Sequence, residues 1–235
     1  MLGDNIIIWG GNRQDGKADM KLYNAMMLPV RKTHEKHLTR RLKHRDFSIL
    51  SQNCTGGVLY HMFGMQMLSP TVDMIIQDEY FLKLAREPYK YIHDLEPFPV
   101  MEQYCDGISR PYPIIGVGDI QLNCQHYESC EQAINDWNRR RKRFNYNKMF
   151  AIFNSWNMYD KSYIDSLRLL GYPYVLFSYD KVDDPNAVIL DHSIWKKDVN
   201  GRISPHLTGY YKGGYKRNFE KIIDFVEWIN ESFDE

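Results

Sequence analysis

The order of apolar and polar positions predicts a chain in which short strands alternate with helices. Short apolar runs typical of buried strands occur at 47–50, 72–76, 120–124, 148–153, 174–178 and 187–190. Helical patterns lie at 20–44, 58–63, 79–85, from 129 onward, 161–170 and 217–231. This alternation predicts an α/β fold of three layers, with a mostly parallel central sheet and helices on both faces.

Local signals set several of the expected boundaries. Ser129 followed three positions later by Gln132 is a capping-box pattern, and it predicts the start of the clearest helix. Pro29 is expected to break or kink the first helix, because proline removes a backbone donor and clashes with the preceding turn. Pro97 and Pro99 predict a break in regular structure.

The amino-terminal part differs from the rest of the chain. Residues 1–20 hold one strand pattern, at 5–9, and are expected to form a flexible arm or an edge strand. The segment 20–44 is basic, which fits a solvated surface helix or a contact with a phosphate-bearing partner. We predict an amino-terminal arm and basic helix over 1–45 and a single α/β domain over 46–235.

Composition limits the possible functions. The chain has 235 residues, and its 30 basic and 30 acidic side chains cancel, which argues against a nucleic-acid-binding protein. No run is long and apolar enough to cross a bilayer, and no signal peptide is recognisable. We therefore expect a cytoplasmic location, with peripheral attachment to a membrane complex as the alternative. The four cysteines lack the spacing of a disulfide scaffold or a structural zinc site, so we expect free thiols. No metal motif occurs, no cofactor is indicated, and the oligomeric state is left open.

The turn at Cys54 carries the strongest functional signal. It follows an apolar strand and precedes a helix, the place where α/β proteins bind ligands. Helix amino termini favour anions and thiolates, so Cys54 is a candidate nucleophile or donor-pocket thiol; the alternative is a small buried side chain. Asn53 is expected to position a substrate or to bond the turn backbone. Gly56 and Gly57 either admit a phosphate or sugar hydroxyl to their N–H groups or serve the turn geometry.

Two histidines are candidate partners of Cys54. His126 follows the strand 120–124, and parallel strands would bring both residues to one edge of the sheet. The alternative for His126 is a structural role beside Tyr127. His61, one to two helical turns after Cys54, is the competing partner. Asp119 is expected at the opposite edge, which argues against a simple triad.

Candidate substrate-binding groups come from two cationic segments. In the run 139–143, most side chains are expected to be solvated, while one guanidinium, with Arg140 and Arg143 as candidates, could bind a pyrophosphate or a polysaccharide carboxylate. Tyr215 lies in a glycine-rich cationic segment, 212–217, that is either an anion-binding loop or an ordinary solvent loop. Tyrosines there would suit stacking on a sugar ring.

Three segments in this order resemble a bacterial family of unknown function labelled as exopolysaccharide biosynthesis proteins. They are 47–57 with Tyr60, 68–71, and 126–145, and the similarity covers about residues 40–230. The departures from the family pattern are Gln52, Thr55 and Phe144. The resemblance implies a role in surface-polysaccharide assembly and defines no reaction.

The leading hypothesis is therefore a transferase acting on a sugar or nucleotide-sugar. Two mechanisms compete: acyl transfer with Cys54 as nucleophile, and glycosyl transfer in which arginines neutralise the leaving diphosphate. The alternative from another class is a non-catalytic module that binds a glycan or nucleotide, or that holds an assembly complex together.

Overall fold

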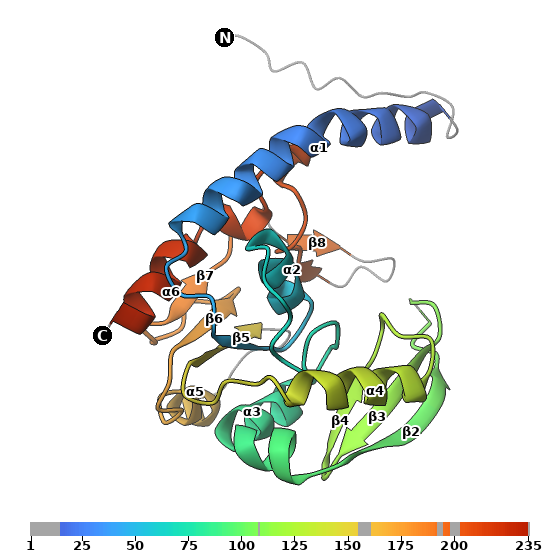
Figure 1. Cartoon of the computed structure of the whole chain (residues 1–235), viewed down its shortest axis with the longest axis vertical. Coiled ribbons are helices and arrows are strands. Elements are labelled where there is room, and N and C mark those ends of the chain that lie inside the picture. The colour runs from blue at the N-terminus through green and yellow to red at the C-terminus, as the bar shows by residue number, and fades with distance from the viewer. Residues whose placement is uncertain (1–14, 108, 155–160, 192–194, 198–202, 235) are drawn as a thin grey trace.

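The structure is a computed structural model that describes residues 15–107, 109–154, 161–191, 195–197 and 203–234 (Figure 1). The strand expected at 5–9 lies outside the described residues. The helices are α1 (Asp15–Arg41), α2 (Thr55–Met62), α3 (Asp78–Arg86), η1 (Lys90–Asp94), α4 (Cys130–Arg141), α5 (Lys161–Leu167), η2 (Tyr211–Gly213), η3 (Asn218–Lys221) and α6 (Phe225–Asp234). The strands are β1 (Ser48–Ser51), β2 (Pro97–Tyr104), β3 (Tyr112–Val117), β4 (Ile120–Asn123), β5 (Met149–Asn154), β6 (Tyr174–Ser178), β7 (Ala187–Ile189), β8 (Trp195–Lys197) and β9 (Ile203–Pro205).

The main sheet has four parallel strands in the order β1-β5-β6-β7. The strands β1, β5 and β6 are buried on both faces, which explains their apolar centres, while the edge strand β7 is partly exposed. In β5, Phe150 and Ile152 point into one core, and Ala151 and Phe153 point into the other. The predicted α/β fold with a mostly parallel sheet is confirmed.

Helices cover both faces of this sheet. One core contains the side chains of α1, α2 and α6, and the other contains those of α3, α4 and α5 (Figure 1). The Ser129 cap of α4 is confirmed, because its hydroxyl accepts from the Gln132 amide at 3.1 Å. Pro29 lies inside α1, which continues to Arg41.

A second sheet, antiparallel, was not expected. It has the order β2-β3-β4, so the segment predicted as a strand of the parallel sheet at 120–124 belongs elsewhere. The cause is a two-residue turn in which Gly118 has φ +58°, a conformation that glycine adopts readily and that reverses the chain. The break expected at Pro97 and Pro99 is also wrong. Both prolines lie in β2, an edge strand, where the missing N–H costs little.

The segment after β1 joins the two sheets. Ile75 exchanges backbone hydrogen bonds with Asn123 of β4, both at 2.9 Å, and the Ile76 amide donates to the Gln52 carbonyl at the end of β1. This segment was predicted as a strand at 72–76, yet only one residue pairs in strand fashion. We call the pairing of Ile75 with Asn123 the Ile75 bridge. Together with the Ile76 hydrogen bond, it brings the end of β4 beside the end of β1.

The final helix is shorter than the periodicity predicts. The segment 217–231 divides into η3 and α6, and Asp224 lies between them. Its carboxylate accepts from the amides of Val226 and Glu227 at 3.0 and 3.2 Å, so it caps α6. A strong capping residue therefore starts a new helix inside an otherwise continuous apolar pattern.

Candidate active site

The structure places Cys54 against His126. The sulfur lies 3.0 Å from Nε2 of the imidazole, within hydrogen-bonding distance. Cys54 is half-buried and His126 is exposed, so solvent reaches the pair. A thiol in contact with an imidazole is the arrangement that activates a cysteine nucleophile.

The local sequence holds Cys54 in a rigid turn at the amino end of α2. Asn53 Oδ1 accepts from both the amide and the hydroxyl of Thr55, at 3.0 and 2.7 Å. Ser51 Oγ donates to the Asn53 carbonyl at 2.7 Å and accepts from the Gly56 amide at 3.0 Å. The turn is thus fixed by its own side chains before any ligand arrives.

These contacts define the roles of the other residues in the turn. The side-chain oxygen of Asn53 accepts a hydrogen bond from the turn backbone, which is one of the two roles expected for this residue. The Gly56 amide donates to Ser51, and a Cβ at this position would lie 2.7 Å from Ser51 Cβ. A Cβ on Gly57 would lie 3.1 Å from Asp73 Oδ1. The close packing of the turn therefore requires glycine at 56, while a side chain at 57 would press on Asp73.

His126 is positioned by its neighbour Tyr127. Tyr127 is buried, and its hydroxyl donates to the Val72 carbonyl at 3.3 Å and accepts from Arg140 at 2.7 Å. Val72 lies just before the Ile75 bridge, so Tyr127 links the end of β4 to the segment that follows β1. The pair with Cys54 therefore depends on contacts between the two sheets.

Asp73 is a site residue that the sequence analysis missed. Its side chain is about one-third exposed and lies 3.6 Å from Nη2 of Arg140. Its backbone has φ +66°, a left-handed conformation that aspartate tolerates better than most residues. Strained backbone of this kind is concentrated at functional sites. The one feature of the sequence that could have indicated Asp73 is its position as an aspartate between apolar residues, in a segment with the pattern of a strand.

The environment of Cys54 keeps its proton on sulfur. Burial, followed by the negative charge of Asp73, raises the pKa of the Cys54 thiol to about 11. At neutral pH the thiol is the dominant form, and it can donate its hydrogen to the imidazole nitrogen. The nucleophile must therefore be generated by proton transfer to His126 during attack, and does not exist beforehand as a free thiolate.

This protonation state predicts a specific order of thiol reactivity. With iodoacetamide at neutral pH, we expect the exposed Cys105 to be alkylated before Cys54. In the His126→Ala protein, where no imidazole takes the proton, the rate at Cys54 should rise about tenfold for each pH unit up to its pKa, because only the thiolate reacts. Peptide mapping by mass spectrometry over a pH series measures both rates. Alkylation of Cys54 before Cys105 at neutral pH would instead indicate a thiolate–imidazolium pair.

Arg140 lies near the pair and contacts the protein itself. It is buried, its Nη1 donates to the Val72 carbonyl at 3.0 Å, and its Nη2 lies 3.1 Å from an Asp136 oxygen. These contacts engage the guanidinium of a residue that is a candidate for binding a pyrophosphate or a polysaccharide carboxylate. Arg143 is half-buried, and its Nε has no hydrogen-bond partner in the described part of the chain.

The two remaining candidates lie against α1. His61 is on an exposed face of α2, with Nδ1 3.9 Å from Glu35. Tyr215 contacts His34 edge-on, with ring centroids 5.1 Å apart. The structure thus pairs the thiol with His126 rather than His61, and it places Tyr215 with the amino-terminal helix.

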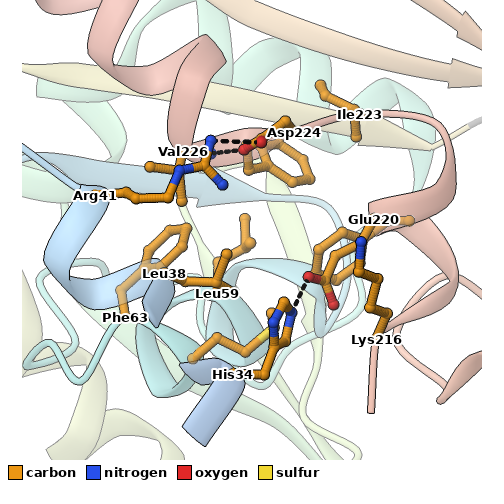
Figure 2. Close-up of a pocket in the computed structure, with 13 residues that line it drawn as sticks. His34, Leu38, Arg41, Leu59, Phe63, Lys216, Glu220, Ile223, Asp224 and Val226 are labelled. Carbon is orange, nitrogen blue, oxygen red and sulfur yellow. Dashed lines mark hydrogen bonds and ion pairs between the residues drawn. The ribbon is translucent and has the colours of Figure 1, made fainter. Parts of the chain in front are cut away.

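A pocket lies between α1, α2 and the segment before α6 (Figure 2). Its floor is apolar, and two contacts span its rim: His34 hydrogen-bonds Glu220 at 2.5 Å, and Arg41 forms an ion pair with Asp224 at 2.6 Å. Its volume of about 70 Å³ is far below that of ordinary metabolite sites, roughly 300–1,000 Å³. We interpret it as a packing gap beneath α1.

Two further properties of the described residues bear on function. Within those ranges, no three histidine, cysteine or acidic side chains gather as a metal site would require. No helix in the same ranges has the length and apolar character needed to span a membrane.

Comparison with known proteins places the chain in a family. Residues 26–230 match the family model described as "Domain of unknown function (DUF1919)". An "Uncharacterized protein" of Haemophilus influenzae is 19% identical over 196 residues, which cover 83% of this chain and 89% of that protein. Because the family model spans most of the sequence, the chain belongs to the DUF1919 family.

Proposed function

We propose that this protein is a cysteine-dependent acyltransferase that acts on a sugar or nucleotide-sugar in surface-polysaccharide assembly. The contact between Cys54 and His126, with sulfur and Nε2 3.0 Å apart, is the observation that carries the chemical part of the proposal. The pathway rests on the resemblance of the three sequence segments. A cytoplasmic location fits the four free cysteines, which are typical of reducing compartments.

The proposed reaction has two half-reactions. His126 Nε2 takes the thiol proton as Cys54 Sγ attacks the carbonyl carbon of an acyl thioester. The tetrahedral intermediate collapses, the carbon–sulfur bond to the donor breaks, and the leaving thiolate takes the proton from His126. A sugar hydroxyl then attacks the acyl-cysteine with His126 as base. The acyl group forms an ester with the sugar, and Cys54 recovers its proton.

Local electrostatics favour acyl transfer over glycosyl transfer. Burial is the larger cause of the raised pKa of Cys54, and the Asp73 carboxylate adds to it, so a diphosphate brought to the same place would meet a negative charge. Arg140, the buried cation nearby, already contacts Asp73 and Asp136. A neutral carbonyl donor suits this environment better than a nucleotide diphosphate leaving group.

A covalent acyl-enzyme tests the proposal directly. Intact-protein mass spectrometry after incubation with a panel of acyl-coenzyme A esters should show one acyl adduct, mapped to Cys54. Cys54→Ala should abolish the adduct, and Cys105→Ala, which removes an exposed thiol elsewhere, should leave it unchanged. Absence of an adduct with every donor, together with thermal stabilisation by a nucleotide-sugar, would favour the non-catalytic binding module instead.

A further inference from the structure

The amino-terminal half of α1 carries an exposed apolar stripe. Leu22, Met26 and Val30 are 64%, 68% and 45% exposed, and their spacing of four residues places them along one side of the helix. Tyr23, 46% exposed, lies beside them. Figure 1 shows this end of α1 extending past the rest of the fold. Contiguous exposed apolar residues of this kind mark interaction surfaces.

A cationic loop, residues 212–221, lies next to the stripe and is held there by hydrogen bonds from α1. Arg31 of α1 donates to the carbonyls of Gly213 and Gly214 at 2.8 and 3.0 Å. A Cβ on Gly213 would lie 3.4 Å from the Tyr23 ring, so the loop lies beside the stripe itself. Lys212, at the tip of the loop, has φ +45°, which few lysines adopt and which these bonds help to hold.

Two lysines of this loop lie near an aromatic ring. The exposed Lys212 and Lys221 place their ammonium groups 5.6 and 4.9 Å from the ring of Tyr211. Neither lysine has an ion-pair partner among the described residues. The nearby Glu220 points inward to His34 (Figure 2). In a chain whose total charge is zero, this is a local excess of positive charge.

We propose that the Leu22–Val30 stripe of α1 and the Lys212–Lys221 loop together form a docking surface for an anionic lipid bilayer. Apolar side chains enter the headgroup boundary while neighbouring lysines face anionic headgroups. A second copy of the chain would bring the same cations together, so charge complementarity favours lipid. The inference is independent of the proposed acyl transfer. It would hold the protein at the surface of a membrane.

Vesicle co-sedimentation tests the proposal. The full chain should bind vesicles containing phosphatidylglycerol and not vesicles of phosphatidylcholine alone, and added salt should weaken binding. Met26→Glu should reduce the bound fraction to background. Lys212→Glu and Lys221→Glu should each weaken binding at least fivefold, since a lysine near an anionic surface contributes about that factor.

Matched control variants distinguish binding through this surface from non-specific binding to vesicles. Leu28→Glu changes a residue 49% exposed on the opposite side of α1, and Lys142→Glu changes an exposed lysine at the end of α4; both should bind normally. Circular dichroism checks that each variant is folded. Equal binding to both vesicle types, no binding, or equal losses in all variants would overturn the proposal. The proposal would also be overturned if the wild-type protein formed a dimer that Met26→Glu dissociates and did not bind vesicles.

Discussion

A His126→Ala variant is expected to lose roughly 10²- to 10⁴-fold in the rate of Cys54 acylation at neutral pH. His126 is the base within reach of the sulfur, at 3.0 Å. Because the pKa of the thiol is raised to about 11, only about one molecule in ten thousand holds a thiolate at pH 7 without that base. The measurement is the rate of acyl-adduct formation by mass spectrometry.

The same variant should recover activity as the pH rises. Without His126, the rate follows the thiolate fraction, which grows about tenfold per pH unit until the pH reaches the raised pKa of Cys54. The wild-type protein, with its internal base, should show a much flatter profile over that range. The difference between the two proteins should therefore be large at neutral pH and small near pH 11.

His61→Ala is the control, because His61 is the competing histidine and lies on an exposed face of α2. It should acylate at the wild-type rate. Equal losses in the two variants would show that the effect is structural. An unchanged rate in His126→Ala would remove His126 from the mechanism and leave Cys54 without its proposed base.

The sequence predicted the Cys54 turn and its partner for different reasons. An apolar strand, a polar turn with two glycines and a helix follow one another locally, and such short-range order can be read directly. The pairing of Cys54 with His126 was expected from parallel strands in one sheet. In the structure β4 belongs to an antiparallel hairpin, and the Ile75 bridge brings the two residues together.

What the sequence did not reveal depends on long-range contacts. Asp73 lies in a segment whose apolar pattern resembles a strand, and the structure gives it a left-handed backbone beside Gly57 and Arg140. Arg140 was one of two candidates for ligand binding in a run of cations, and the run itself does not indicate the contacts of its guanidinium with Val72, Asp73 and Asp136. Only the tertiary structure shows that this side chain joins the two sheets.

An Arg140→Met variant is expected to destabilise the fold by about 3 kcal/mol. Arg140 is 6% exposed, and methionine would keep much of its volume but none of its donors. The carboxylates of Asp73 and Asp136 would lose their buried partner, and Val72 would lose a hydrogen bond at 3.0 Å. This loss of unfolding free energy is at the lower end of the range for breaking a buried ion pair, because both carboxylates retain some contact with water. Urea unfolding followed by circular dichroism measures the change.

Arg139→Met provides a control on the same helix and the same carboxylate. Arg139 pairs with Asp136 at 2.7 Å but is 63% exposed, so its loss should cost no more than about 0.5 kcal/mol. The two variants thus differ in burial rather than in charge. Because Arg140 also bonds the hydroxyl of Tyr127, the neighbour of His126, Arg140→Met should slow Cys54 acylation even under conditions where it is fully folded. A folded Arg140→Met protein with the wild-type acylation rate would show that the contact between the sheets is not what positions His126.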